Sequence, residues 1–170
     1  ETITKFNEAA AMVPGCYDCY YNIGFNYTQK KDYEQAEAAF LKSIELKAMT
    51  RTREAVGERG HVNATSYNRT LLLTGEVAAE TDKVAVEQAV AKIEGVRSVV
   101  NELVVAGSTS LAARSTDAIL TSKVKASFID AKDVFANAIK VVTERGTVYL
   151  MGRVTEREAN RASDIARSVG

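Results

Sequence analysis

The sequence is poor in the residues from which reactive sites are usually built. Its 170 residues include one histidine, two cysteines, one proline and no tryptophan, and its ten glycines never occur in a cluster. Without a glycine-rich loop there is no cradle for phosphate, and the sequence supports no Ser/His/Asp or Cys/His set around the one histidine. His61 is interpreted as a residue at the start of a strand. The sequence therefore predicts a protein that is not an enzyme, with no catalytic residue, no cofactor and no metal site.

Charge and hydropathy argue against two further classes. The 22 basic and 22 acidic residues give a formal net charge of zero, whereas nucleic-acid-binding proteins usually carry a basic surplus. Nucleic acid is therefore not an expected partner. No apolar run approaches the ~20 residues that span a bilayer. The chain begins with Glu1, inside a helical pattern, so we expect any export signal or lipid-anchor cysteine to precede the printed residues.

Cys16 and Cys19 form a C-x-x-C segment. Such a segment can be a redox motif or half of a zinc site, but there is no second one, and no nearby histidine, to complete four zinc ligands. The other interpretation is two small residues at the start of a helix, and the sequence favours it. Two cysteines so close together cannot build the disulfide framework of a small secreted protein.

The first 48 residues carry apolar positions at helical spacing. They predict a helix that ends near Pro14-Gly15, a second helix over Tyr17–Gln29 and a third over Tyr33–Lys47. Phe6 recurs as Phe40, a spacing of about 34 residues that is typical of the tetratricopeptide repeat. The segment resembles one and a half units of that repeat.

Gly24 stands where the repeat has a glycine that lets two helices approach closely. A solenoid usually needs about three repeats to bury a continuous core, so we expect a fragment of an array, a capping piece or a fused segment. The other matching positions are Tyr20, Ile23, Tyr27, Ala36, Phe40 and Ser43.

A second repeat dominates the rest of the chain. The strand Leu71–Val77 returns as Val148–Val154, with Gly75 and Gly152 in the same place. A glycine inside a strand suggests close approach of another backbone, or a bulge. The predicted order in the first copy is strands Val62–Ser66 and Thr70–Val77, helix Glu80–Ile93 and strand Val99–Val105. The second copy has helix Ser115–Asp130, strands Ile139–Thr143 and Thr147–Val154, and a helix that begins with the capping box Thr155–Glu158.

The two copies differ at their ends. The first has an ill-patterned polar stretch, Arg51–Gly60, where the second has an opening helix, and the second lacks the closing strand of the first. We therefore expect an incomplete or chimeric chain with a joint near Ala48–Arg51. The predicted domains are a helical segment at 1–48, a first domain at 49–106, a linker at 107–114 and a second domain at 115–170.

The repeated strings resemble the BON-domain family, and most of all its dual-domain outer-membrane lipoproteins. The resemblance implies an α+β fold with two small domains, each a three-stranded mixed sheet with helices packed on one face. It implies a periplasmic protein at the inner leaflet of the outer membrane, held by a lipid anchor outside this chain. The implied role is to bind anionic phospholipid and maintain outer-membrane integrity, with envelope proteins as further partners. The strings are Asn63–Tyr67, Leu71–Gly75, Thr121–Lys125 and Val148–Ala159.

The resemblance places the lipid-facing element on the helix Ser115–Asp130. Where family members carry a tryptophan, this chain has Ile119. The predicted lipid-binding residues are Ile119, Ser122, Lys123 and Ala126. The alternative is a surface helix with one stray isoleucine and charges that cancel, from Asp117, Lys123, Lys125 and Asp130. The alternative function is a protein–protein interaction scaffold that works through the tetratricopeptide-like segment.

Overall fold

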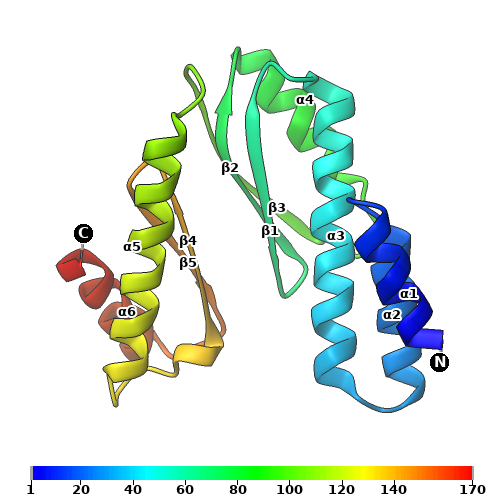
Figure 1. The fold of residues 1–170 in the computed structure, drawn as a ribbon. Helices are drawn as coiled ribbons and strands as arrows, with labels where there is room; N and C mark the ends of the chain where they lie inside the picture. The colour runs from blue at the N-terminus through cyan, green and yellow to red at the C-terminus, as the bar shows by residue number, and fades with distance from the viewer. Residues whose placement is uncertain (1, 170) are drawn as a thin grey trace. The chain divides into compact units, whose positions relative to one another are not determined.

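The computed structural model describes residues 2–169. The chain folds into two compact units, residues 1–107 and 108–170. The first unit contains helices α1 to α4 and strands β1 to β3, and the second contains α5, α6, β4 and β5 (Figure 1). This confirms the predicted α+β class with an N-terminal helical segment.

The helical segment consists of α1 (Thr2–Met12), α2 (Tyr17–Gln29) and the long α3 (Tyr33–Val56). α2 packs against both of its neighbours. A Cβ atom at Gly24 would lie 2.9 Å from two carbons of the Phe40 ring. The predicted role of Gly24 is thereby confirmed, since a larger residue would push α2 away from α3.

The predicted end of the third helix is wrong. The sequence pattern placed it at Lys47 and left Arg51–Gly60 irregular, whereas α3 continues to Val56. Ala48, Thr52 and Val56 are buried one turn apart along this extension. The extension packs on β1 and α4, so it supplies the opening helix that the first copy was expected to lack.

The first unit has a three-stranded mixed sheet, as predicted. β1 (His61–Tyr67) runs antiparallel to β2 (Thr70–Val77), and β2 runs parallel to β3 (Ser98–Val105) after the crossover helix α4 (Glu80–Ala91). α3 packs against β1, and α4 packs against β3. The core between the helices and the sheet is apolar and contains Ala48, Val56, Leu71, Leu73, Val77, Val86, Val90, Ile93 and Leu103.

Both strand glycines are approached closely by backbone, as the sequence predicted. Gly75 has φ +115°, and a Cβ atom there would lie 2.0 Å from the carbonyl oxygen of His61. At Gly152 the carbonyl oxygen of Ala138 would lie 2.8 Å away. The glycines are therefore required by the sheets themselves.

The second unit packs two helices on a β-hairpin. α5 (Leu111–Asp130) contacts β4 (Ile139–Glu144) and α6 (Glu156–Val169), and β4 pairs antiparallel with β5 (Thr147–Gly152). A short 3₁₀ turn, η1 (Ala136–Ala138), precedes β4. The buried core contains Val124, Phe128, Val134, Ile139, Val141, Ala162, Ile165 and Ala166.

The capping box at the start of α6 is confirmed. The backbone N–H of Thr155 donates to Glu158 Oε2 at 2.9 Å, and the N–H of Glu158 donates to Thr155 Oγ1 at 3.3 Å. The bond from the Thr155 N–H, followed by that from its hydroxyl, holds the pKa of Glu158 below its ordinary value. The carboxylate is thus kept ionised at the positive end of the helix dipole.

The predicted boundary between residues 48 and 49 falls inside α3, and the predicted linker at 107–114 begins where the two units divide. α5 begins one turn earlier than predicted, because the Ser110 hydroxyl caps it by accepting the N–H of Ala113. The division into a helical segment, two domains and a linker, and the joint expected near Ala48–Arg51, stay predictions.

Candidate functional site

The inner face of α5 builds the core of the second unit. Leu120, Val124 and Phe128 share this face and pack with the hairpin and α6, as the sequence predicted. Asp117 lies on the same face and is 7% exposed. Its carboxylate accepts the backbone N–H groups of Arg145 and Gly146, at 2.9 and 2.8 Å. Asp117 therefore holds α5 against the β4–β5 turn.

This role of Asp117 changes the charge of the helix surface. The sequence alternative counted Asp117 against the lysines, so that the charges of the helix cancelled. In the structure Asp117 is buried and bonded to the turn. Lys123, Lys125 and Asp130 are exposed on α5 and Arg114 is half-buried, so its surface carries three basic residues against one aspartate.

The four predicted lipid-binding residues lie together on the outer face of α5. Ile119 is 57% exposed, and Ser122, Lys123 and Ala126 are also exposed. Each lies three positions from one of the others and four from another, which places them side by side on a helix. The Ser122 hydroxyl donates to the carbonyl oxygen of Ala118 at 3.0 Å, so it is satisfied within the helix. The patch is thus apolar with a lysine at its edge.

Sequence reasoning missed three exposed apolar residues in the same unit. Leu111, Ile129 and Phe135 are 80%, 75% and 75% exposed. Leu111 and Ile129 lie on the same side of α5, about five turns or ~27 Å apart. Leu111 was missed because it was placed in the linker, although Ser110 was the available signal for a helix start. Phe135 lies in the loop that follows α5.

None of the helices in residues 2–169 has the length and apolar character needed to cross a membrane. Within those described residues, no cluster of three His, Cys, Asp or Glu side chains is arranged to hold a metal ion. His61 begins β1, as predicted, with its Nε2 3.2 Å from Asn63 Nδ2.

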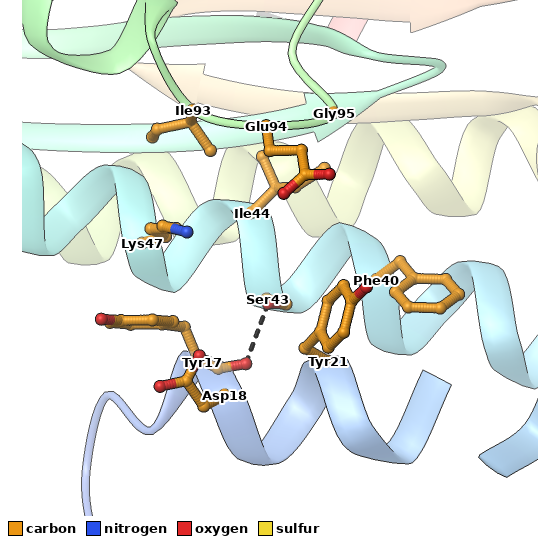
Figure 2. Close-up of a pocket in the computed structure, with 10 residues that line it drawn as sticks. All are labelled: Tyr17, Asp18, Tyr21, Phe40, Ser43, Ile44, Lys47, Ile93, Glu94 and Gly95. Atoms are coloured by element: carbon orange, nitrogen blue, oxygen red, sulfur yellow. Dashed lines mark hydrogen bonds between the residues drawn. The ribbon is translucent and has the colours of Figure 1, made fainter. Parts of the chain in front are cut away.

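The first unit contains a groove between α2, α3 and the turn after α4 (Figure 2). Its volume is about 560 Å³. The rings of Tyr21 and Phe40 meet edge to face at 5.5 Å, and Lys47 Nζ lies 5.4 Å from the centre of the Tyr17 ring. Ser43 Oγ donates to the carbonyl oxygen of Tyr17 at 2.9 Å and thereby links α3 to the start of α2. The other lining residues are Asp18, Ile44, Ile93, Glu94 and Gly95.

Known protein families match both the helical segment and the two repeated domains of this chain. A BON-domain model matches residues 46–107 and 116–170, and a tetratricopeptide-repeat model matches residues 17–48. The chain is 42% identical over 136 residues to the outer membrane lipoprotein DolP of Haemophilus influenzae, which covers 79% of the chain and 65% of that protein. It is 29% identical over 112 residues to a 21 kDa hemolysin of Actinobacillus pleuropneumoniae, which covers 66% of the chain and 58% of that protein. The chain thus spans less than two thirds of the length of these curated relatives.

Proposed function

The chain belongs to the BON-domain family, and from this premise we propose that it is a non-enzymatic envelope protein that binds anionic phospholipid through the outer face of α5. Its similarity to an outer membrane lipoprotein supports a location in the periplasm, at the inner leaflet of the outer membrane, with the lipid anchor outside this chain. The proposed role is to help maintain the integrity of that membrane.

The observation that carries this proposal is the composition of the outer face of α5. Apolar Leu111, Ile119 and Ile129 lie along it, with Lys123 and Lys125 at its two edges. Helices that lie in a membrane surface place apolar side chains among the acyl chains and basic ones at the headgroups. Each lysine near an anionic surface contributes about 1 kcal/mol, and the Asp117 carboxylate points to the β4–β5 turn rather than to this face.

Ile119→Asp is expected to weaken binding to anionic vesicles about thirtyfold, because it removes an apolar insertion and adds a repelled charge, each worth about 1 kcal/mol. Flotation with phosphatidylglycerol vesicles measures the change, and phosphatidylcholine vesicles should bind neither protein. Lys123→Glu should weaken binding to a similar degree, and the remaining binding should depend less on salt.

Two control variants make the same chemical changes elsewhere. Val84→Asp replaces an apolar residue on α4 that is 54% exposed, close to the 57% of Ile119. Lys42→Glu reverses an exposed charge on α3. Both controls should float like the unchanged protein. Equal flotation of the α5 variants and the controls would contradict the proposal.

The second candidate function is a scaffold that binds another protein through the groove of the first unit. The observation that favours it is the aromatic lining, with Tyr21 53% exposed beside the Phe40 ring. The groove also presents the carboxylates of Asp18 and Glu94, while Lys47 lies over a tyrosine ring. This lining suits a peptide with an apolar side chain next to a basic one.

Peptides selected from a displayed library test the scaffold. Peptides that occupy the groove should lose binding to Tyr21→Ala and to Glu94→Gln, and should keep binding to Ile119→Asp. Peptides that bind all three variants equally would count against the groove. Vesicle binding should show a different pattern. If only Ile119→Asp weakens it, lipid binding belongs to α5 and not to the groove.

A further inference from the structure

The C-x-x-C segment holds a disulfide between Cys16 and Cys19 at the start of α2. Cys16 is the N-cap residue of the helix and is partly exposed, whereas Cys19 lies in the first turn and is 7% exposed. The sequence favoured two inert small residues at these positions. The bond between them shows instead a pair of sulfurs with unequal access to solvent.

We propose that Cys16–Cys19 is a thiol–disulfide exchange site, at which Cys16 reacts with a dithiol of another protein or of a small molecule. The unequal exposure decides the direction of attack. An incoming thiolate reaches the sulfur of Cys16, and Cys19 is the leaving group because its side chain is buried. Exchange sites commonly pair an accessible, low-pKa cysteine with a resolving cysteine nearby.

The start of α2 also favours Cys16 as a thiolate. The backbone N–H of Cys19 points at Cys16 Sγ, with the nitrogen 3.2 Å from the sulfur. This N–H and the positive end of the helix dipole stabilise negative charge on that sulfur when the bond is open. Reactive cysteines are characteristically found in such positions.

The groove of the first unit is lined by Tyr17 and Asp18, the two residues between the cysteines, but by neither cysteine. The reacting partner therefore approaches the partly exposed Cys16 from solvent rather than through the groove. The bond also closes a very short loop, so the stabilisation expected from chain entropy is at the low end for a disulfide.

The exchange transfers two electrons from the partner's dithiol to the Cys16–Cys19 bond. The partner's first thiolate forms a bond to Cys16 Sγ, the Cys16–Cys19 bond breaks, and its electron pair leaves on Cys19 Sγ. The partner's second thiolate then attacks the partner sulfur that is bonded to Cys16 Sγ. This forms the partner's disulfide and releases the thiolate of Cys16. The partner's dithiol is oxidised to a disulfide by loss of two electrons. The two cysteines of this chain are reduced and take up the two protons.

Alkylation of the reduced full chain with iodoacetamide at pH 7 tests which sulfur reacts. Peptide mapping should show Cys16 modified at least tenfold faster than Cys19, because it is the more accessible and the better stabilised thiolate. Equal rates, or a faster Cys19, would overturn the proposal. This measurement uses the unchanged chain, so it does not depend on whether a variant folds.

Reduction of the oxidised chain tests exchange itself. Dithiothreitol in native buffer should reduce the Cys16–Cys19 bond at least tenfold faster than it reduces oxidised glutathione. In Cys19→Ser, oxidised glutathione should be trapped as a mixed disulfide on Cys16, and in Cys16→Ser no adduct should form on Cys19. Reduction that requires guanidinium would show a purely structural bond and would overturn the proposal.

Discussion

Gly75→Ala is expected to destabilise the three-stranded sheet of the first unit severely. The residue has φ +115°, a conformation that costs a residue with a Cβ about 1–3 kcal/mol. The new Cβ would also lie 2.0 Å from the carbonyl oxygen of His61, a backbone atom of the neighbouring strand that has no free rotation with which to avoid it. We expect a total loss on the order of 4 kcal/mol, which is a large part of the stability of a typical domain.

Urea denaturation followed by circular dichroism measures this loss. Gly107→Ala is the matched control, because a Cβ there meets no atom within 4 Å. Gly152→Ala should fall between the two, since the added Cβ would lie 2.8 Å from a carbonyl oxygen but φ is not positive. A Gly75→Ala midpoint equal to that of Gly107→Ala would show that β1 moves aside at no cost.

Met49→Pro is expected to cost about 3 kcal/mol or more. Met49 lies in the middle of α3, where a proline removes a backbone hydrogen bond and clashes with the preceding turn. Its side chain is 45% exposed, so the effect should come from the backbone. Because both the helical segment and the sheet pack on α3, both should lose stability together.

The control for this variant is Met49→Ala, which changes the side chain and keeps the helix. Urea unfolding of the two variants gives the comparison. The sequence-based boundary between residues 48 and 49 makes the opposite prediction, since a proline between two separate domains is tolerated. A Met49→Pro protein as stable as Met49→Ala would therefore restore that boundary and contradict a continuous α3.

The strands could be predicted because their pattern is local. β2 was placed over its observed residues, Thr70–Val77, since its alternation and flanking turn lie within a few positions. The second half of α3 could not be predicted in this way. Its buried stripe contains an alanine and a threonine, Ala48 and Thr52, and only Val56 is strongly apolar. Helix geometry arises here from packing on the sheet, which outweighs the weak local pattern.

The placement of the proposed lipid-binding residues on one exposed face could be predicted for a similar reason. Helical spacing alone places Ile119, Ser122, Lys123 and Ala126 on one face, and the structure has them there. The inward direction of the Asp117 carboxylate depends on its partners Arg145 and Gly146, which are distant in the sequence. No local pattern reveals such a contact, so the charge balance of α5 required the folded chain.

The continuity of α3 also limits how this protein can be rebuilt from parts. Ala36, Ala39 and Ser43 are buried in the first half of the helix, and Ala48, Thr52 and Val56 in the second half. At about 100° per residue, these two sets lie on roughly opposite sides of the helix axis. An insertion of one residue between them would turn the second set by about 100° away from the sheet. A graft of another helical segment at this junction should therefore succeed only when its length preserves the helical phase, as additions of about 7 or 11 residues nearly do.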